Sequence, residues 1–160
     1  MTYRPIEVPE RTRLNVILTE GDRRIVMLAG EISEDERHLF QEVATEAQPD
    51  VRFSFPSFPS DNDSRAFILL VRTEAIGFRC DWPDVNPKGA EAQTGYQQRW
   101  AIRIIWIAPP CRRRGFITYL IGRTLVHLDE IPSEVAWHRP LTDEGKIIAS
   151  RHSPERIFVV

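Results

Sequence analysis

The chain has 160 residues and a formal net charge of −2, with 42% hydrophobic and 28% charged residues. This length and composition suit one globular domain with its own core. A balanced charge argues against a nucleic-acid-binding domain, which is usually strongly basic, so we expect no direct nucleic-acid partner. The N-terminus has no apolar signal core and every apolar run is strand-sized. We therefore expect a cytoplasmic protein with no membrane span.

The sequence contains two cysteines, Cys80 and Cys111, which form no C-x-x-C pair. Zinc sites and redox motifs require closely spaced cysteines, so no metal site is predicted. We expect both thiols to be reduced and partly buried, as is usual in the cytoplasm.

The N-terminal part is predicted to form a β-hairpin and a helix. Residues 13–28 alternate apolar and polar side chains around Gly21 and Asp22, which predicts the hairpin. A helix is predicted from Ser33, because Ser33 and Glu36 have the spacing of a capping box. Its apolar stripe consists of Leu39, Phe40, Val43 and Ala47. Pro49 is expected to end this helix.

A proline-rich loop is predicted after Pro49. It carries four apolar side chains, which are Val51, Phe53, Phe55 and Phe58. Loops with this many apolar anchors usually pack on the core or border a ligand cleft. Packing on the core is the preferred interpretation, and an apolar rim for a substrate is the alternative.

Strands and helices are predicted to alternate in the rest of the chain. Residues 65–72 and 75–82 form strands, and residues 99–108 form the most apolar strand. This strand is apolar on both faces, which indicates a central position, and Trp100, Ile102, Ile104 and Trp106 are expected to share one face. A helix at 116–128, a strand at 134–139, a helix capped by Thr142 and a strand at 156–160 follow. The predicted class is α/β with much antiparallel pairing.

A basic turn joins the strand at 99–108 to the helix at 116–128. It contains Arg112, Arg113, Arg114 and Gly115 after two prolines. A helix N-terminus has free N–H groups and a partial positive charge, so it binds phosphates. Gly115 permits a tight turn. The guanidinium group of an arginine can bind two phosphate oxygens at once. The turn therefore suits a pyrophosphate, with an ordinary solvated surface as the alternative.

The stretch IWIAPPCRRRGFI resembles the coenzyme-A-binding motif of the GNAT N-acetyltransferases. In that motif an apolar strand end is followed by proline and then by Arg/Gln-x-x-Gly-x-Gly/Ala. Ile107, Pro109, Arg112 and Gly115 match it in register, and Ile117 stands where the family has glycine or alanine. Within the superfamily, residues 65–160 are most similar to the acetyltransferase domain of the sister-chromatid cohesion acetyltransferases.

The resemblance implies a single GNAT-like domain over residues 1–160, with a mixed, largely antiparallel central sheet flanked by helices. Residues 12–64 would form an N-terminal hairpin, helix and loop, and residues 65–160 the cofactor-binding core. The implied cofactor is acetyl-CoA. Its pantetheine arm would lie along Ile105, Trp106 and Ile107. Its pyrophosphate would lie at Arg112, Arg113, Arg114, Gly115, Phe116 and Ile117.

The implied reaction is direct transfer of an acetyl group from acetyl-CoA to an amine of a small molecule or a protein. A backbone N–H near Ile107 would polarise the thioester carbonyl. The amine must also lose a proton to a base. The resemblance implies that the carboxylates used as bases by the cohesion enzymes are replaced here by Gly122 and Arg139. Neither residue can accept a proton at neutral pH.

Two other side chains are candidates for the base. His138 ends a strand beside the expected cleft, and the ordinary pKa of histidine suits acid–base chemistry. Asp81 ends a hairpin strand near the same cleft. A surface histidine and a turn carboxylate are the alternative interpretations. The alternative function is therefore a catalytically inactive GNAT-fold module that binds coenzyme A or a protein partner, and the sequence leaves a homodimer open.

Overall fold

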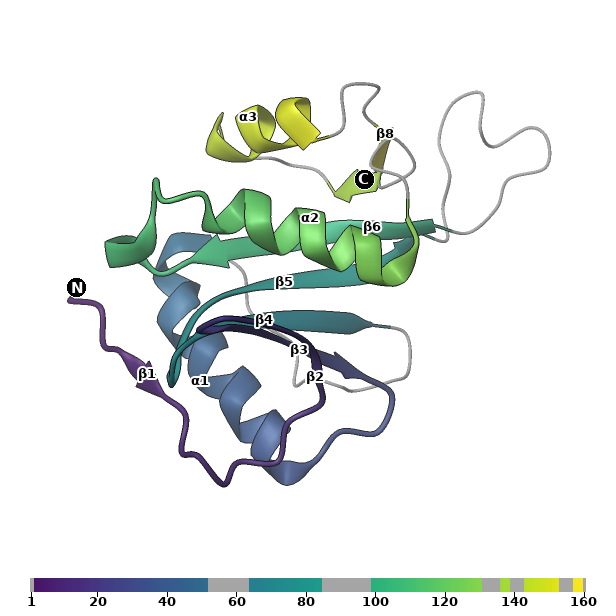
Figure 1. Cartoon of the computed structure of the whole chain (residues 1–160). Helices are drawn as coiled ribbons and strands as arrows, with labels where there is room; N and C mark the ends of the chain where they lie inside the picture. Colours follow the sequence, from purple (N-terminus) through teal and green to yellow (C-terminus); the bar gives the residue numbers. More distant parts are fainter. Residues whose placement is uncertain are drawn as a thin grey trace.

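The computed structural model describes residues 2–51, 64–84, 99–130, 136–138, 143–152 and 157–159. Its sheet has eight strands in the order β2-β3-β4-β5-β6-β7-β8, with β1 paired to β5 (Figure 1). The strands are β1 (Ile6–Glu7), β2 (Val16–Glu20), β3 (Arg23–Ala29), β4 (Arg65–Val71), β5 (Glu74–Asp84), β6 (Arg99–Ile107), β7 (Ala136–His138) and β8 (Ile157–Val159). The helices are α1 (Glu34–Val51), α2 (Phe116–Leu128) and α3 (Asp143–His152), with a 3₁₀ turn at Pro109–Cys111.

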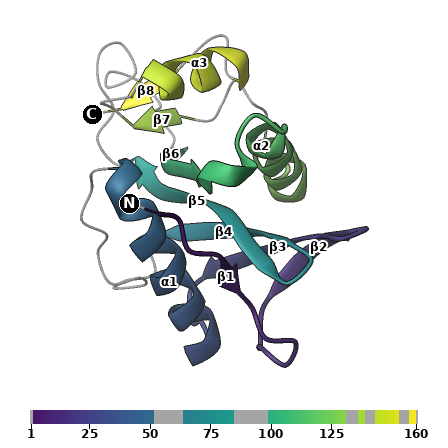
Figure 2. The same cartoon turned by 90° about the vertical axis from the view of Figure 1, so that its left-hand side faces the viewer.

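The predicted order of elements is confirmed, and the short strand β1 is an addition to it. Strands β2 to β6 pair antiparallel, whereas β7 pairs parallel with both β6 and β8. The α/β class with a mixed, largely antiparallel sheet is therefore confirmed. Helix α1 covers one face of the sheet, and α2 and α3 lie on the other (Figure 2). No helix in the described part of the chain is long and apolar enough to span a membrane.

Helix α1 begins as predicted but extends further. The Glu36 N–H donates to Ser33 Oγ at 3.1 Å and the Ser33 N–H donates to Glu36 Oε1 at 2.9 Å, which completes the capping box. The prediction that Pro49 ends the helix is wrong, because α1 continues to Val51. Proline removes one intrahelical bond, and tertiary contacts hold the last turn: Asp50 accepts a hydrogen bond from β6 and Val51 packs on the core.

A bulge in β6 changes which of its residues face α1. The register steps from Cys80↔Ile104 to Asp81↔Ile102, so Arg103 has no partner on β5. Ile104 therefore packs among the α1 residues, while Ile102 packs against α2 and α3. The prediction that Ile102 and Ile104 share a face is wrong, because one extra residue inverts the alternation of a strand.

Gly77 lies where β5 and β6 approach each other closely. A Cβ atom at this position would lie 2.7 Å from the carbonyl oxygen of Trp106, and closer still to Cδ1 of Ile107. The isoleucine side chain can turn away, but the Trp106 carbonyl belongs to the backbone of β6. A larger residue would therefore push the two strands apart.

We expect Gly77→Ala to lower the free energy of unfolding by about 1–3 kcal/mol, because overpacking displaces the β6 backbone. The control is Gly122→Ala in α2, where a Cβ would meet nothing within 4 Å. This control is expected to raise stability by up to about 1 kcal/mol, since alanine favours the helix. Urea denaturation of both variants measures the difference, and equal stabilities would contradict the prediction.

Candidate active site

One edge of β6 is open along its C-terminal half. Strand β7 pairs with β6 only at Ala101↔Ala136 and Ile102↔Trp137, and no described strand pairs with that edge beyond these positions. The Ala108 N–H donates to the Ile76 carbonyl of β5 at 2.7 Å, which fixes the direction of the neighbouring groups. Because the direction alternates along a strand, the backbone groups of Ile107 and Ile105 point toward the open edge. An extended ligand with amide groups has the right form to pair with this edge.

The basic turn after β6 presents its backbone to the start of α2. Arg113 has φ 64° and Gly115 has φ 79°, so both lie in the left-handed region. Glycine adopts this conformation at no cost, which explains Gly115. Helix α2 begins at Phe116 without a side-chain cap, and the Tyr119 N–H donates to the Gly115 carbonyl at 3.0 Å. The N–H groups of Phe116 and Ile117 precede this first turn bond and have no acceptor within the helix.

A cavity of about 160 Å³ lies between the turn, the start of α2 and α3. It is lined by Ile107, Cys111, Arg112, Arg113, Gly115, Phe116, Ile117, Thr118, Ile148 and Arg151. The structure thus brings together the end of β6, the basic turn and the helix start that the sequence predicts to bind a cofactor. Ile148 and Arg151 of α3 are not predicted from the sequence, because only the sheet order places α3 beside α2.

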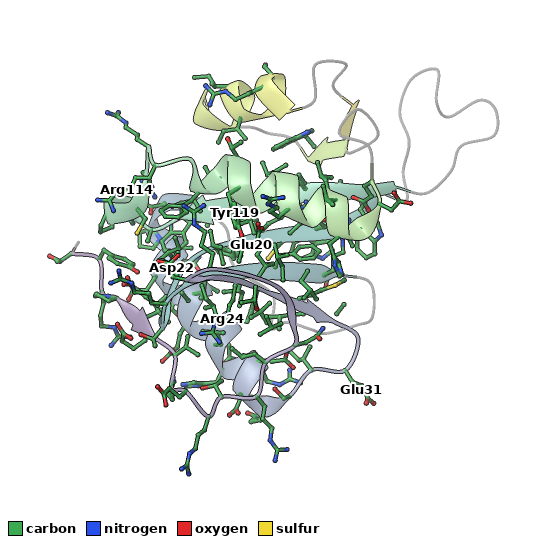
Figure 3. The ribbon with its side chains drawn as sticks, viewed as in Figure 1. Glu20, Asp22, Arg24, Glu31, Arg114 and Tyr119 are labelled. Carbon is green, nitrogen blue, oxygen red and sulfur yellow. The ribbon has the colours of Figure 1, made fainter. Side chains whose placement is uncertain are left out.

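Three of the predicted cofactor residues do not line this cavity. Ile105 is half-buried against the α2–α3 cluster, and the Trp106 side chain is buried on the α1 face. The backbone of Ile105 belongs to the open edge, whereas the backbone of Trp106 faces β5, opposite Phe78. Arg114 lies exposed at the turn, away from Tyr119 (Figure 3). Ile117, the departure from the family motif, packs beside the α2–α3 cluster and leaves its backbone N–H at the helix start.

The Arg112 side chain is directed toward α1 and the end of β6. Its Nε donates to the Ile107 carbonyl at 2.9 Å, and its Nη2 donates to Asp50 Oδ2 at 2.8 Å. The Trp106 indole N–H donates to the same carboxylate oxygen at 2.8 Å. These bonds, first from Trp106 and then from Arg112, lower the pKa of Asp50. Asp50 is not predicted from the sequence, since nothing local connects it to a turn 60 residues away.

Asp81 is buried within a network of charges beneath α2. It is fully buried and accepts hydrogen bonds from Arg79 Nε at 2.9 Å, Arg79 Nη2 at 2.7 Å and Arg65 Nε at 2.9 Å. Arg79 also donates to Thr124 of α2 at 2.7 Å, and Arg65 to Glu130 at 2.8 Å. The prediction that Asp81 ends a strand at the cleft is wrong, because β5 continues past it. Two guanidinium groups occupy its carboxylate, which leaves it unsuited to accept a substrate proton.

His138 is placed by its backbone alone. It is the β7 residue directly after the last β6–β7 pair, and its Cα partner is Val159 of β8. It therefore lies where β6 and β7 separate, while its side chain is outside the described residues. Arg139, Thr142 and the loop residues Phe53, Phe55 and Phe58 are also outside the described residues. The predicted role of His138 remains a prediction.

Helix α2 is held against the β2–β3 hairpin by a cluster around Tyr119 (Figure 3). The Tyr119 hydroxyl donates to Glu20 Oε1 at 3.0 Å, and Arg123 forms an ion pair with the same carboxylate at 2.9 Å. The Arg23 guanidinium lies 4.7 Å from the centre of the Tyr119 ring. Burial and the bond to Glu20 raise the pKa of Tyr119. Tyr119 therefore serves to hold α2 against the hairpin.

Several solved acetyltransferase structures are similar to this chain. The xEco2 acetyltransferase domain bound to a CoA conjugate has a TM-score of 0.71 at 16% identity, over 92% of this chain and 98% of that chain. The aminoglycoside acetyltransferase meta-AAC0020 from an uncultured soil metagenomic sample, in complex with sisomicin, has a TM-score of 0.59 at 16% identity, over 81% and 86%. The ribosomal-protein-alanine N-acetyltransferase from Brucella melitensis biovar Abortus 2308 has a TM-score of 0.56 at 14% identity, over 82% and 90%.

Neither a protein-family model nor a curated protein matches the sequence. The similarity is therefore one of fold. The chain has the GNAT fold, which confirms the fold that the sequence resemblance implies.

We expect Asp81→Ala to lower the free energy of unfolding by about 3–5 kcal/mol, because it leaves the fully buried Arg79 guanidinium without its carboxylate partner and Arg65 with Glu130 alone. The control is Asp22→Ala, which removes an exposed ion pair to Arg72 with an N–O distance of 3.8 Å. Exposed pairs contribute little, so the control should change stability by less than about 1 kcal/mol. Thermal and urea unfolding compare the two, and a loss below 1 kcal/mol for Asp81→Ala would contradict the prediction.

Proposed function

We propose that the protein is an acyl-CoA-dependent N-acyltransferase that transfers an acetyl group from acetyl-CoA to an amine. The observation that carries the proposal is the meeting of an open strand edge, a basic turn and an uncapped helix start around one cavity. Each part fits a part of coenzyme A. The pantetheine arm is extended and carries amide groups, which suits a strand edge, and the pyrophosphate suits a helix N-terminus.

The proposed cofactor contacts divide between backbone and side chains. The backbone groups of Ile105 and the N–H group of Ile107 on the open edge would pair with the pantetheine amides, since the Ile107 carbonyl already accepts from Arg112. The N–H groups of Phe116 and Ile117 would bind the pyrophosphate. Arg113 and Arg114 extend from the same turn, and Arg151 approaches from α3. Arg113 and Arg151 line the cavity and Arg114 lies exposed at the turn beside it, and together they would provide the charge that a polyphosphate ligand requires.

The proposed reaction needs one base and one donor to the developing oxyanion. The amine nitrogen attacks the thioester carbonyl carbon, the C–N bond forms, and the C–S bond breaks to release the coenzyme A thiolate. A backbone N–H on the open edge of β6 would stabilise the oxyanion. His138 is proposed to accept the amine proton, because its backbone lies where β6 and β7 separate.

The proposed acceptor class is an amine of a small molecule or a protein. The names of the similar structures include both an aminoglycoside acetyltransferase and a ribosomal-protein-alanine N-acetyltransferase. We propose the cytoplasm as the compartment, because Cys80 and Cys111 are both free thiols and neither forms a disulfide among the described residues.

We expect the purified protein to bind acetyl-CoA with a dissociation constant in the micromolar range, about the level usual for enzyme substrates. The double variant Arg113→Gln/Arg114→Gln should bind at least about tenfold more weakly, because each arginine offers a charge-assisted bond to phosphate. Isothermal titration calorimetry measures both constants. The matched control, Arg11→Gln/Arg24→Gln, removes the same charge from exposed or partly exposed positions outside the cavity. No binding at millimolar acetyl-CoA, or an equal loss in both double variants, would contradict the proposal.

We expect His138→Gln to remove the acid limb of the kcat/KM profile against pH, because a base must be unprotonated to accept the amine proton. Release of the free thiol from acetyl-CoA reports transfer to a panel of polyamines, aminoglycosides and peptide N-termini. His127→Gln, an exposed substitution in the last turn of α2, is the control and should keep the wild-type profile. An unchanged profile in His138→Gln would exclude His138 as the base. Binding of acetyl-CoA without transfer to any amine would favour a non-catalytic module.

A further inference from the structure

We propose that Asp50 and Arg112 are a positioning pair that shapes the coenzyme A site without contacting the phosphates. The proposal rests on the proposed function, since coenzyme A is the ligand that the pair serves. It assigns Arg112 a different role from the other arginines of the turn. It also gives a role to Asp50, at the end of α1.

The hydrogen bonds of Arg112 point away from the helix start. Its Nε binds the Ile107 carbonyl at 2.9 Å and its Nη2 binds Asp50 Oδ2 at 2.8 Å. The same oxygen of Asp50 accepts the Trp106 indole N–H at 2.8 Å. One carboxylate thus connects the last turn of α1, the end of β6 and the first residue of the basic turn.

Arg112 is also the arginine whose charge is already compensated. Its guanidinium and the Asp50 carboxylate form an ion pair, and both side chains are 39% exposed. The Trp106 and Arg112 hydrogen bonds hold the pKa of Asp50 below its ordinary value, so the carboxylate is charged at neutral pH. By contrast, no ion pair links Arg113 or Arg114 to another residue that the structure describes. The positive charge that the turn can offer to a phosphate is therefore that of Arg113 and Arg114.

The residues that follow Arg112 need to be held in place. Arg113 and Gly115 both have left-handed backbone conformations. For a non-glycine residue this conformation costs energy and persists only where the surrounding contacts hold it. The bonds of Arg112 to Asp50 and Ile107 fix the start of this segment. The backbone N–H groups after it then keep their direction toward the cavity. A positioning role follows from this placement.

The two roles predict opposite effects of removing Asp50. If Arg112 binds a phosphate, Asp50 competes for it, and Asp50→Ala should tighten the binding of coenzyme A. If the pair positions the turn, Asp50→Ala and Arg112→Ala should both weaken binding. Their effects should not add, because each variant breaks the same contact.

The experiment measures coenzyme A binding by calorimetry in the wild type, Asp50→Ala, Arg112→Ala and the double variant. We expect each single variant to bind about tenfold more weakly, and the double variant to be no weaker than Arg112→Ala. Asp50→Asn should recover part of the loss, because its amide oxygen still accepts a hydrogen bond. The control is Glu46→Ala, one turn earlier in α1, where the carboxylate pairs with Arg4 at 3.6 Å. It should bind coenzyme A like the wild type.

Hydrogen exchange of the peptide that covers residues 109–117 gives a second measurement, which does not require coenzyme A. Exchange should be faster in Asp50→Ala and Arg112→Ala than in the wild type or Glu46→Ala. Tighter binding by Asp50→Ala, or unchanged exchange at the turn, would overturn the positioning pair while the proposed function stands. If the wild type binds no coenzyme A, the proposed function fails. The hydrogen exchange of residues 109–117 then decides by itself whether Asp50 and Arg112 hold the turn in place.

Discussion

The separation of β6 from β7 is the constraint on which the rest of the structure depends. A strand inside a sheet normally uses both edges, because unpaired N–H and C=O groups are costly when they lose water. Here β6 is paired with β5 on both sides of its bulge, but within the part of the chain that the structure describes it meets β7 at only two positions. Apart from the Ile107 carbonyl, which accepts from Arg112, the backbone groups of this edge are available to water or to the proposed ligand. The basic turn and α2 lie directly after this edge in the chain, which places charge and free helix N–H groups beside it.

The buried charges beneath α2 keep that geometry fixed. Arg79 and Asp81 are fully buried, and Thr124 completes the network from α2. The cost of desolvation means that a buried ion pair adds little net stability. Removing one partner of the pair, however, strongly destabilises the fold, because it leaves the other charge buried and unpaired. Hydrogen-bond direction is also more specific than apolar contact. The network therefore favours a single placement of α2 on the sheet, and the start of α2 is where the proposed cofactor contacts lie.

Most of the fold could be predicted from local sequence patterns, because hairpins, caps and apolar periodicity depend on near neighbours. The GNAT likeness of the turn at Arg112–Gly115 had the same local origin. The failures all involve contacts between distant parts of the chain. Pro49 does not end α1 because β6 holds the next residue, and Ile102 changes face because β6 contains a bulge at Arg103. Asp81 had the residue type of a base, but its partner Arg65 becomes visible only once β4 and β5 are paired.

Contacts between distant parts of the chain also distinguish two groups of arginines. Arg65, Arg79 and Arg112 each bind a carboxylate. Each also joins two elements: Arg65 connects β4 to β5, Arg79 connects β5 to α2 through Thr124, and Arg112 connects the turn to α1. A guanidinium group suits this task because its planar fork binds two acceptors with defined directions. An arginine that is paired in this way positions the elements it joins, and its charge is neutralised by the paired carboxylate. An arginine without such a partner keeps a positive charge that is available to an anionic ligand. In the RRRG turn both kinds stand side by side, so the run of three like charges in the sequence overstates the charge that the turn offers to a ligand. With Arg112 paired to Asp50, the turn would offer a proposed anion the charges of Arg113 and Arg114, and Arg151 of α3 lines the same cavity as Arg113.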